Sequence, residues 1–146
     1  MYRHILLPVD GSDVSDYAAD EGIKLAAALG SEISFLYVVD ISVATLPDAE
    51  SAISNFEVIE RSLREQGRKT LREQKDKAVA AGIEAKAVLV EGTVHDEILK
   101  AALEGETDLI IMGTHGRTGL NRFLLGSVAD FISKRAHCPV LLVRPV

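Results

Sequence analysis

The sequence predicts an α/β protein with an open parallel sheet of five strands and helices on both faces. Short apolar runs alternate with longer segments of helical periodicity along the 146 residues, and such alternation is typical of parallel sheets. The runs are apolar throughout, as expected for strands that are buried on both faces. Their order is β-α-β-α-β-α-β-loop-α-β, and right-handed crossovers leave few topologies. With no internal repeat or linker, we expect a single domain over residues 1–146.

The first strand is predicted at residues 5–9, where an apolar run ends in a turn sequence. Pro8 cannot donate a hydrogen bond to a neighbouring strand, so it should lie near the end of the strand. A helix follows, because Ser12 or Asp13 can cap it and apolar residues then recur at helical spacing. Gly30 is a suitable C-terminal stop for this helix.

The rest of the chain repeats this pattern around one irregular stretch. Residues 40–54 contain Pro47 and are interpreted as an insertion within the domain. A polar helix is expected from about Asn55 to Ala81, ended by Gly82. The other expected elements are strands at 33–39, 85–90, 109–112 and 140–143, a short helix behind Thr93, and a helix from Gly126-Ser127 to about Ala136.

Composition and charge exclude several classes of protein. The net charge of −6 argues against general binding to nucleic acid or to an anionic membrane. No apolar run approaches the ~20 residues of a membrane helix, and the start of the chain does not resemble a signal peptide, so we expect a cytoplasmic protein. Cys138 is the only cysteine, which excludes a disulfide scaffold and a cysteine zinc site. We interpret it as a buried structural thiol.

The glycine-rich loop 113–128 carries the chemistry most suited to a ligand. Four glycines lie between a strand and a helix, where the backbone can approach a ligand closely. The helix that begins at Gly126-Ser127 offers unpaired N–H groups and a partial positive charge, which favour phosphate. Residues 109–129 contain no Asp or Glu but include His115, Arg117 and Arg122. This pattern predicts a polyphosphate site, with a plain structural turn as the alternative.

Familiar nucleotide motifs are absent. There is no G-x-x-x-x-G-K-[ST] sequence, which excludes a P-loop NTPase, and no G-x-G-x-x-G follows the first strand. The sequence Asp10-Gly11-Ser12-Asp13 weakly resembles the strand-one loop of nucleotide alpha hydrolases but lacks their paired glycines.

A more specific resemblance covers essentially the whole chain. The spacing Gly113-x2-Gly116-x9-Gly126-Ser127 matches the ATP-binding motif of the universal stress protein family. Residues 8–12, 36–40 and 138–143 resemble the opening, second strand and closing strand of that family. The resemblance implies an adenine nucleotide alpha hydrolase-like sheet of order 3-2-1-4-5, a role in stress or regulatory signalling, and ATP bound with Mg²⁺ or Mn²⁺.

The resemblance also implies a set of binding residues. Adenosine would meet Pro8, Val9 and Asp10, with the Val38 backbone at adenine and Met112 and Gly113 along the ribose. The phosphates would be flanked by His115, Gly116 and Arg117 and held by Gly126, Ser127 and Val128. Reasoning from the residues alone leaves it equally open whether Asp10 contacts a ligand or only forms a turn or caps a helix, and it favours Val38 as a core residue.

The resemblance further implies a homodimer, because family members commonly pair their last strands, here 140–143. An unidentified protein partner would read the nucleotide state. No Walker-type aspartate or water-positioning residue is recognisable, so we expect ATP binding with little or no turnover and assign no catalytic residue. The alternatives are a slow ATPase that uses Arg117 or Arg122, and a nucleotide-free dimeric interaction module. The charged run 61–77 is interpreted mainly as a solvated helix face.

Overall fold

A computed structural model of the chain describes residues 1–41, 49–114 and 126–145, without the side chains of residues 49–55. Its elements alternate between strand and helix. In chain order they are β1 (His4–Pro8), α1 (Asp13–Leu29), β2 (Glu32–Val39), α2 (Ala49–Ala80), β3 (Ala85–Glu91), α3 (Val94–Glu104), β4 (Leu109–Gly113), α4 (Ser127–Arg135) and β5 (Val140–Val143).

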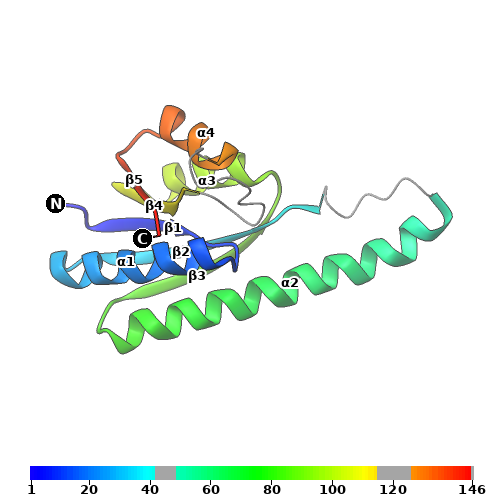
Figure 1. Cartoon of the computed structure of the whole chain (residues 1–146), viewed down its shortest axis with the longest axis horizontal. Coiled ribbons are helices and arrows are strands. Elements are labelled where there is room, and N and C mark those ends of the chain that lie inside the picture. Colours follow the sequence, from blue (N-terminus) through cyan, green and yellow to red (C-terminus); the bar gives the residue numbers. More distant parts are fainter. Residues whose placement is uncertain (42–48, 115–125, 146) are drawn as a thin grey trace.

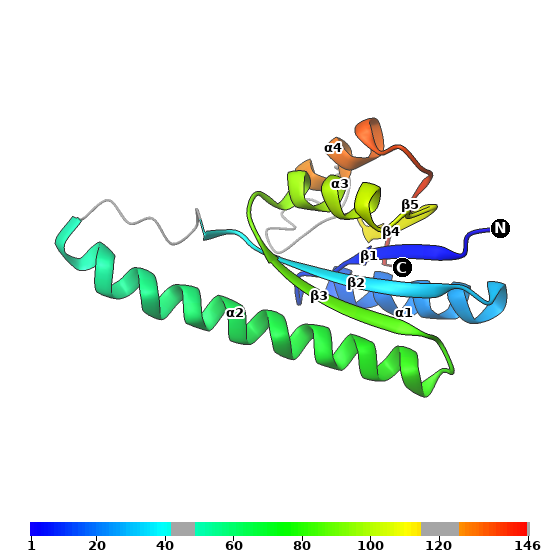
Figure 2. The same cartoon turned by 180° about the vertical axis from the view of Figure 1, so that it is seen from behind.

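The five strands form one parallel sheet of order β3-β2-β1-β4-β5. This confirms the predicted fold class and strand order. Helices α1 and α2 cover one face of the sheet, and α3 and α4 lie on the other (Figures 1 and 2). Neighbouring side chains of β1 enter different layers, because successive residues of a strand point to opposite faces. Leu7 is packed on the side of α1 and α2, whereas Leu6 packs with Ile98 of α3 and Ile132 of α4.

Helix α1 begins and ends as the sequence predicts. Ser12 is its N-cap, and the Ser12 hydroxyl accepts a hydrogen bond from the Ser15 N–H at 3.2 Å. Gly30 closes the helix in the left-handed conformation at φ 71°, and its N–H donates to the Ala26 carbonyl. Pro8 is the last residue of β1, so its missing N–H does not interrupt the hydrogen bonds in the interior of the sheet.

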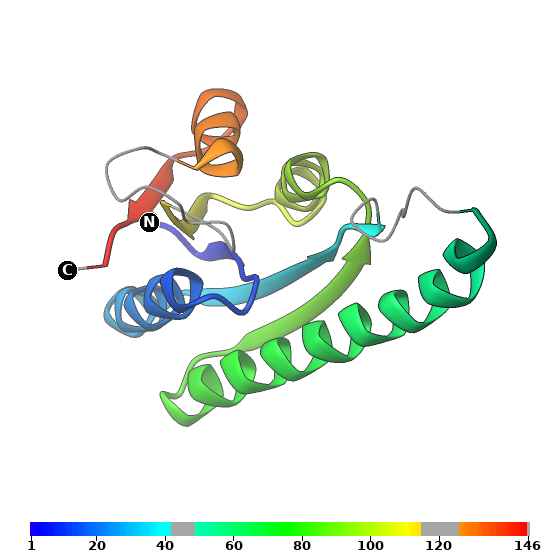
Figure 3. The ribbon, with the colours of Figure 1, turned by 45° about the vertical axis from the view of Figure 1, so that its right-hand side comes forward.

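The predicted start of the second helix was wrong. Helix α2 begins at Ala49, so residues 49–54 belong to it and not to an insertion. Alanine and glutamate at the start favour a helix intrinsically, although no clear apolar stripe marks it. The first half of α2 extends past the sheet, as Figure 3 shows. Leu71, Gln74 and Ala78 in the second half are buried against the sheet and α1.

Helix α2 has 32 residues, which is long enough to cross a bilayer, but it is not apolar enough to do so. Across the described ranges, helices that are both long enough and apolar enough for that role are absent.

The close approach of α1 to the sheet depends on Gly22. A Cβ atom at this position would lie 2.5 Å from Leu7 Cδ1 and 3.5 Å from Ile111 Cδ1, and both of these side chains are fully buried. Helix and sheet are therefore packed at a distance that only glycine permits here.

We predict that Gly22→Ala destabilises the fold by about 1–3 kcal/mol through overpacking, even though alanine alone would favour the helix by about 1 kcal/mol. Urea unfolding measures the effect. Leu7→Ala removes the clashing atom, so Gly22→Ala introduced into that background should be neutral or stabilising. An equal cost of Gly22→Ala in both backgrounds would contradict the packing explanation.

Candidate functional site

The carboxyl ends of the central strands β2, β1 and β4 border a cavity of about 360 Å³. Its position agrees with the rule that ligands of open α/β sheets bind beyond the carboxyl ends of the strands, where the winding direction reverses. Residues from the strands, the β1–α1 loop and the helices α2, α3 and α4 contribute to the lining.

Most of the predicted binding residues meet in this cavity. The nine that line it are Pro8, Val9, Asp10, Val38, Met112, Gly113, Gly126, Ser127 and Val128. The other three, His115, Gly116 and Arg117, lie outside the described residues, as does Arg122. The structure therefore brings together residues from four distant parts of the sequence.

Asp10 is held in a tight turn at the mouth of the cavity. Its Oδ1 accepts a hydrogen bond from the Ser12 N–H at 2.9 Å, and its own N–H donates to Ser15 Oγ at 3.1 Å. Gly11 between them adopts φ +81°, a conformation that favours glycine. Asp10 is thus a turn former that also lines the cavity, so the structural and the ligand-facing interpretations are compatible.

The start of α4 also lines the cavity. The Thr114 N–H donates to the Val143 carbonyl at 3.1 Å, and the Gly126 N–H donates to the Thr114 carbonyl at 2.6 Å. The first hydrogen bond within α4 runs from Asp130 N–H to the Gly126 carbonyl. The N–H groups of residues 127–129 therefore have no helical carbonyl four residues earlier. Since Gly126 has no side chain to cap them, they form a site suited to an anion.

The cavity has apolar lining residues that the sequence did not reveal. It is lined by Leu36 of β2, Leu63 of α2, and Val94 and Ile98 of α3. Sequence periodicity cannot show which residues of separate helices line one cavity. Three polar lining residues, Ser15, Asp40 and Thr114, were also absent from the predicted set. Of these, Asp40 had a visible signal, because it follows directly after a strand.

Helix α2 supports the loop that carries Asp10. A Cβ on Gly11 would lie 3.2 Å from Thr70 Oγ1, so the loop and the helix are in close contact. One turn further on, Gln74 Nε2 donates to Asp16 Oδ1 at 3.1 Å. Burial raises the pKa of Asp16, more than the Lys77 ammonium lowers it.

The predicted solvated face of residues 61–77 is largely exposed, with exceptions that connect α2 to its neighbours. Lys77 pairs with Asp20 of α1 at 3.2 Å. Arg64 lies between Glu60 of its own helix and Glu91 at the end of β3, and it pairs with both. These contacts fix α2 beside the cavity to which it contributes Leu63.

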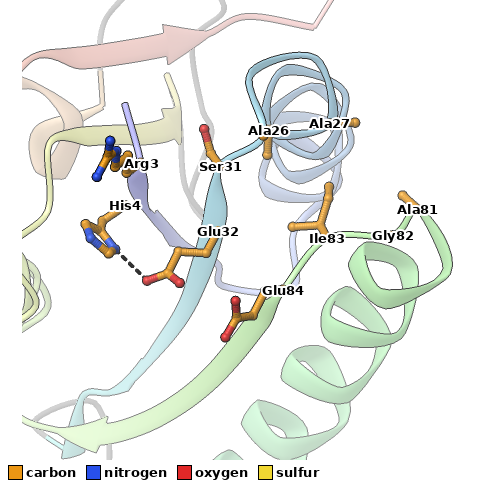
Figure 4. Close-up of a pocket in the computed structure, with 11 residues that line it drawn as sticks. Arg3, His4, Ala26, Ala27, Ser31, Glu32, Ala81, Gly82, Ile83 and Glu84 are labelled. Atoms are coloured by element: carbon orange, nitrogen blue, oxygen red, sulfur yellow. Dashed lines mark hydrogen bonds and ion pairs between the residues drawn. The ribbon is translucent and has the colours of Figure 1, made fainter. Parts of the chain in front are cut away.

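A second cavity, of about 560 Å³, lies at the amino ends of β1, β2 and β3. His4 Nδ1 and Glu32 Oε1 are 2.5 Å apart there, and Glu84, which directly precedes β3, also lines the cavity (Figure 4). Helices α1 and α2 end at this cavity, so their carbonyl ends and these carboxylates disfavour an anion. A nucleotide phosphate is therefore better suited to the cavity at the carboxyl ends.

Metal-binding side chains do not cluster in the part of the chain that is described: no group of three or more His, Cys, Asp or Glu residues could hold a metal ion there. His95 instead stacks on Phe131, with ring centroids 4.1 Å apart. Cys138 is half-buried and not fully buried as expected, and its burial raises the pKa of the thiol.

Comparison with known proteins gives a consistent result. The family model described as the universal stress protein family matches residues 1–144. The universal stress protein MJ0531 of Methanocaldococcus jannaschii is 42% identical over 144 residues, which cover 99% of this chain and 83% of the relative.

Solved structures extend the similarity to three dimensions. The structure of MJ0577, also from Methanocaldococcus jannaschii, superposes with a TM-score of 0.86 at 30% identity and covers 100% of this chain and 98% of that one. A universal stress protein solved in complex with cAMP has a TM-score of 0.74 at 26% identity, with 99% of each chain covered.

The raised pKa of Asp16, which accepts a hydrogen bond from Gln74, predicts that the stability of the fold depends on pH. Because the pKa of Asp16 is raised above 3.8 in the folded chain, the folded state holds this proton more tightly than the unfolded state. The resulting stabilisation is present at pH values below 3.8 and is lost as the pH rises through the folded pKa. In Asp16→Asn the amide oxygen can still accept a hydrogen bond from Gln74. We predict that the stability of this variant no longer falls as the pH rises through the folded pKa of Asp16.

Urea unfolding at a series of pH values from acid to neutral measures the difference between the two proteins. Asp76→Asn is the matched control, because Asp76 is exposed on α2 and makes no ion pair among the described residues. If wild type and Asp16→Asn show parallel pH profiles, burial of this carboxyl group does not affect stability.

Proposed function

This chain belongs to the universal stress protein family, and from that premise we propose that it is a single-domain regulatory protein that binds Mg-ATP or a related adenine nucleotide. The nucleotide would occupy the cavity at the carboxyl ends of β1, β2 and β4. The observation that carries the proposal is the start of α4, where residues 126–129 line this cavity and the N–H groups of residues 127–129 lack helical partners.

The distribution of charge supports one orientation of the nucleotide. The α4 terminus attracts phosphate, whereas Asp10 and Asp40 would repel it. Phosphates therefore belong beside Gly126 and Ser127, and the nucleoside belongs beside β1 and β2. His115, Gly116 and Arg117 would flank the phosphates from the loop between β4 and α4. A relative solved with cAMP supports an adenine nucleotide as the ligand.

The divalent cation of the proposed complex would arrive with the phosphates. The described residues supply no protein group of three metal ligands, which suits a cation held mainly by phosphate oxygens and water. The Ser127 hydroxyl is the side chain best placed in sequence to add a ligand, since it belongs to the first turn of α4.

Binding with little or no turnover remains the preferred form of the proposal. Asp10 is engaged in its own turn through Oδ1, and we assign no residue to activate water. A slow ATPase is the second candidate. Sustained phosphate release by the pure protein, lost in Arg117→Ala, would favour it over the binding function.

We also propose a homodimer formed by β5, which is the last strand of the sheet. The carbonyls of Pro139 and Val143 accept hydrogen bonds from β4. Since backbone groups of alternate residues point to opposite sides of a strand, Val140 and Leu142 direct theirs to the other edge. A second copy could pair there about a twofold axis and cover this edge.

The binding proposal is tested by Ser127→Pro. Proline is favoured at the first position of a helix, and Gly126 before it has φ −60° and ψ 151°, a conformation that a residue before proline adopts. The variant should therefore fold while losing one N–H and the hydroxyl. We expect calorimetry with Mg-ATP to show binding weakened about tenfold or more, since a hydrogen bond to a charged group contributes about 1.5–3 kcal/mol.

Ser127→Ala is the matched control, because it removes the hydroxyl and keeps the N–H. It should bind Mg-ATP more tightly than Ser127→Pro. Equal affinity of both variants would show that the amide does not contact the ligand. Wild-type protein that gives neither heat nor a thermal shift with Mg-ATP would refute the binding function and favour a nucleotide-free interaction module.

The dimer is tested by comparing Leu142→Pro with Leu142→Ala. Both variants lose the side chain, but only proline loses the N–H that points to the outer edge of β5. Light scattering after size exclusion should give a dimer for wild type and Leu142→Ala and a monomer for Leu142→Pro. A wild-type monomer at micromolar concentration, or a Leu142→Pro dimer, would contradict pairing through this edge.

A further inference from the structure

Helix α2 consists of two parts that contact the rest of the molecule differently. Between residues 56 and 66 every side chain is exposed or only partly buried, and this part of the helix lies toward the end that extends past the sheet (Figure 3). Buried residues recur from position 67 onward, namely Gly67, Thr70, Leu71, Gln74 and Ala78. Local opening costs least where few buried contacts hold a segment, so the first part of α2 can open while the second part stays in place.

Gly67 marks the boundary between the two parts. A Cβ atom there would lie 2.7 Å from Tyr37 Cδ1 and 2.7 Å from Leu89 Cδ1, so the close contact of α2 with the sheet requires glycine at this point. Glycine also disfavours a helix more than any residue except proline. The helix is therefore intrinsically weak where its buried contacts begin, and an opening of the first part would stop there.

An ion pair holds the first part of α2 close to this boundary. Arg64 pairs with Glu91, the last residue of β3, and with Glu60 one turn earlier in its own helix at 3.2 Å. Among the described residues, no ion pair from α2 to another element lies nearer the start of the helix. The Arg64 and Glu91 side chains are 35% and 33% exposed, so water and salt screen their attraction only in part.

We propose that the Arg64–Glu91 ion pair is a latch that holds the first part of α2 against the sheet and so keeps the α2 wall of the cavity at the carboxyl ends in place. Leu63, next to Arg64, is the residue that α2 contributes to this lining. When the pair breaks, the opening of α2 reaches the turn that carries Leu63, and the cavity loses this part of its wall.

The consequence of the latch for a ligand rests on the proposed nucleotide-binding function. A ligand that contacts Leu63 binds the closed state more tightly than the open state, so it shifts the population toward closed α2. Loss of the ion pair has the opposite effect, because it favours the open state and with it the release of the ligand.

Hydrogen–deuterium exchange of the protein without nucleotide tests the latch itself. Glu91→Gln nearly preserves the shape of the side chain and removes its charge. We expect peptides within residues 56–66 to exchange about two- to fivefold faster in this variant, which is the scale of losing a partly exposed ion pair. Peptides within residues 68–80 should exchange as in wild type. Equal acceleration of both segments, or of neither, would overturn the latch.

Three further variants serve as controls. Glu21→Gln removes an exposed pair with Lys24, at 2.9 Å on α1, and should leave exchange of α2 unchanged. Glu60→Gln removes only the pair within α2 and should have a smaller effect than Glu91→Gln. Arg64→Gln combined with Glu91→Gln should exchange no faster than Arg64→Gln alone, because each single change already breaks the pair. Additive effects in the double variant would contradict a direct latch.

Mg-ATP tests the link between the latch and the cavity. Saturating Mg-ATP should slow the exchange of residues 56–66 in wild type, and a fluorescent ATP analogue displaced by excess Mg-ATP should dissociate about two- to fivefold faster from Glu91→Gln. Calorimetry that shows binding, together with exchange that Mg-ATP does not change, would overturn the link to the cavity. Absence of binding would refute the proposed function instead, whereas exchange of the nucleotide-free protein still decides whether the latch exists.

Discussion

The reversal of winding between β1 and β4 is the constraint on which the site depends. From β1 the chain moves outward through α1 to β2 and through α2 to β3, and α3 then returns it to β4 on the other side of β1. The helices before the return lie on one face of the sheet and those after it on the opposite face (Figure 2). The connections that leave β1 and β4 therefore diverge, and the space between them is the cavity that holds Asp10 and the start of α4.

The same topology gives the two ends of the sheet opposite electrostatic character. Helices that connect parallel strands run against them, so helix N-termini gather at the carboxyl ends of the strands and helix C-termini at the amino ends. At α1, the Ser12 hydroxyl already caps the N-terminus. At α4, the cap position is Gly126, which offers no side chain, so the first N–H groups of this helix are left for an anion. Glu32 and Glu84 at the far end add negative charge where the helix C-termini already supply it.

Local chemistry made part of this arrangement predictable from sequence. Ser12 and Gly30 marked the ends of α1, and the apolar run 140–143 gave the bounds of β5. The strand order and the expected binding roles of Val38 and Met112 came from the family resemblance, since periodicity does not say which strands are neighbours. The start of α2 was misplaced because residues 49–54 favour a helix without an apolar stripe. Leu63 and Ser15 were missed as lining residues because a cavity is a property of elements that meet only in the folded chain.

The glycine motif itself has more than one physical cause. A Cβ at Gly113 would lie 2.7 Å from Val14 Cγ1 and 3.3 Å from the Val14 carbonyl oxygen, so this glycine permits α1 to pack on the end of β4. Gly126 has φ −60°, which any residue can adopt, so its conformation does not require glycine either. What Gly126 provides is an N–H that bonds to the Thr114 carbonyl and a helix start without a competing side chain. One glycine of the motif therefore permits the close packing of the strand and helix that border the site. Another leaves the start of α4 without a competing side chain, so both packing and the proposed anion binding account for the motif.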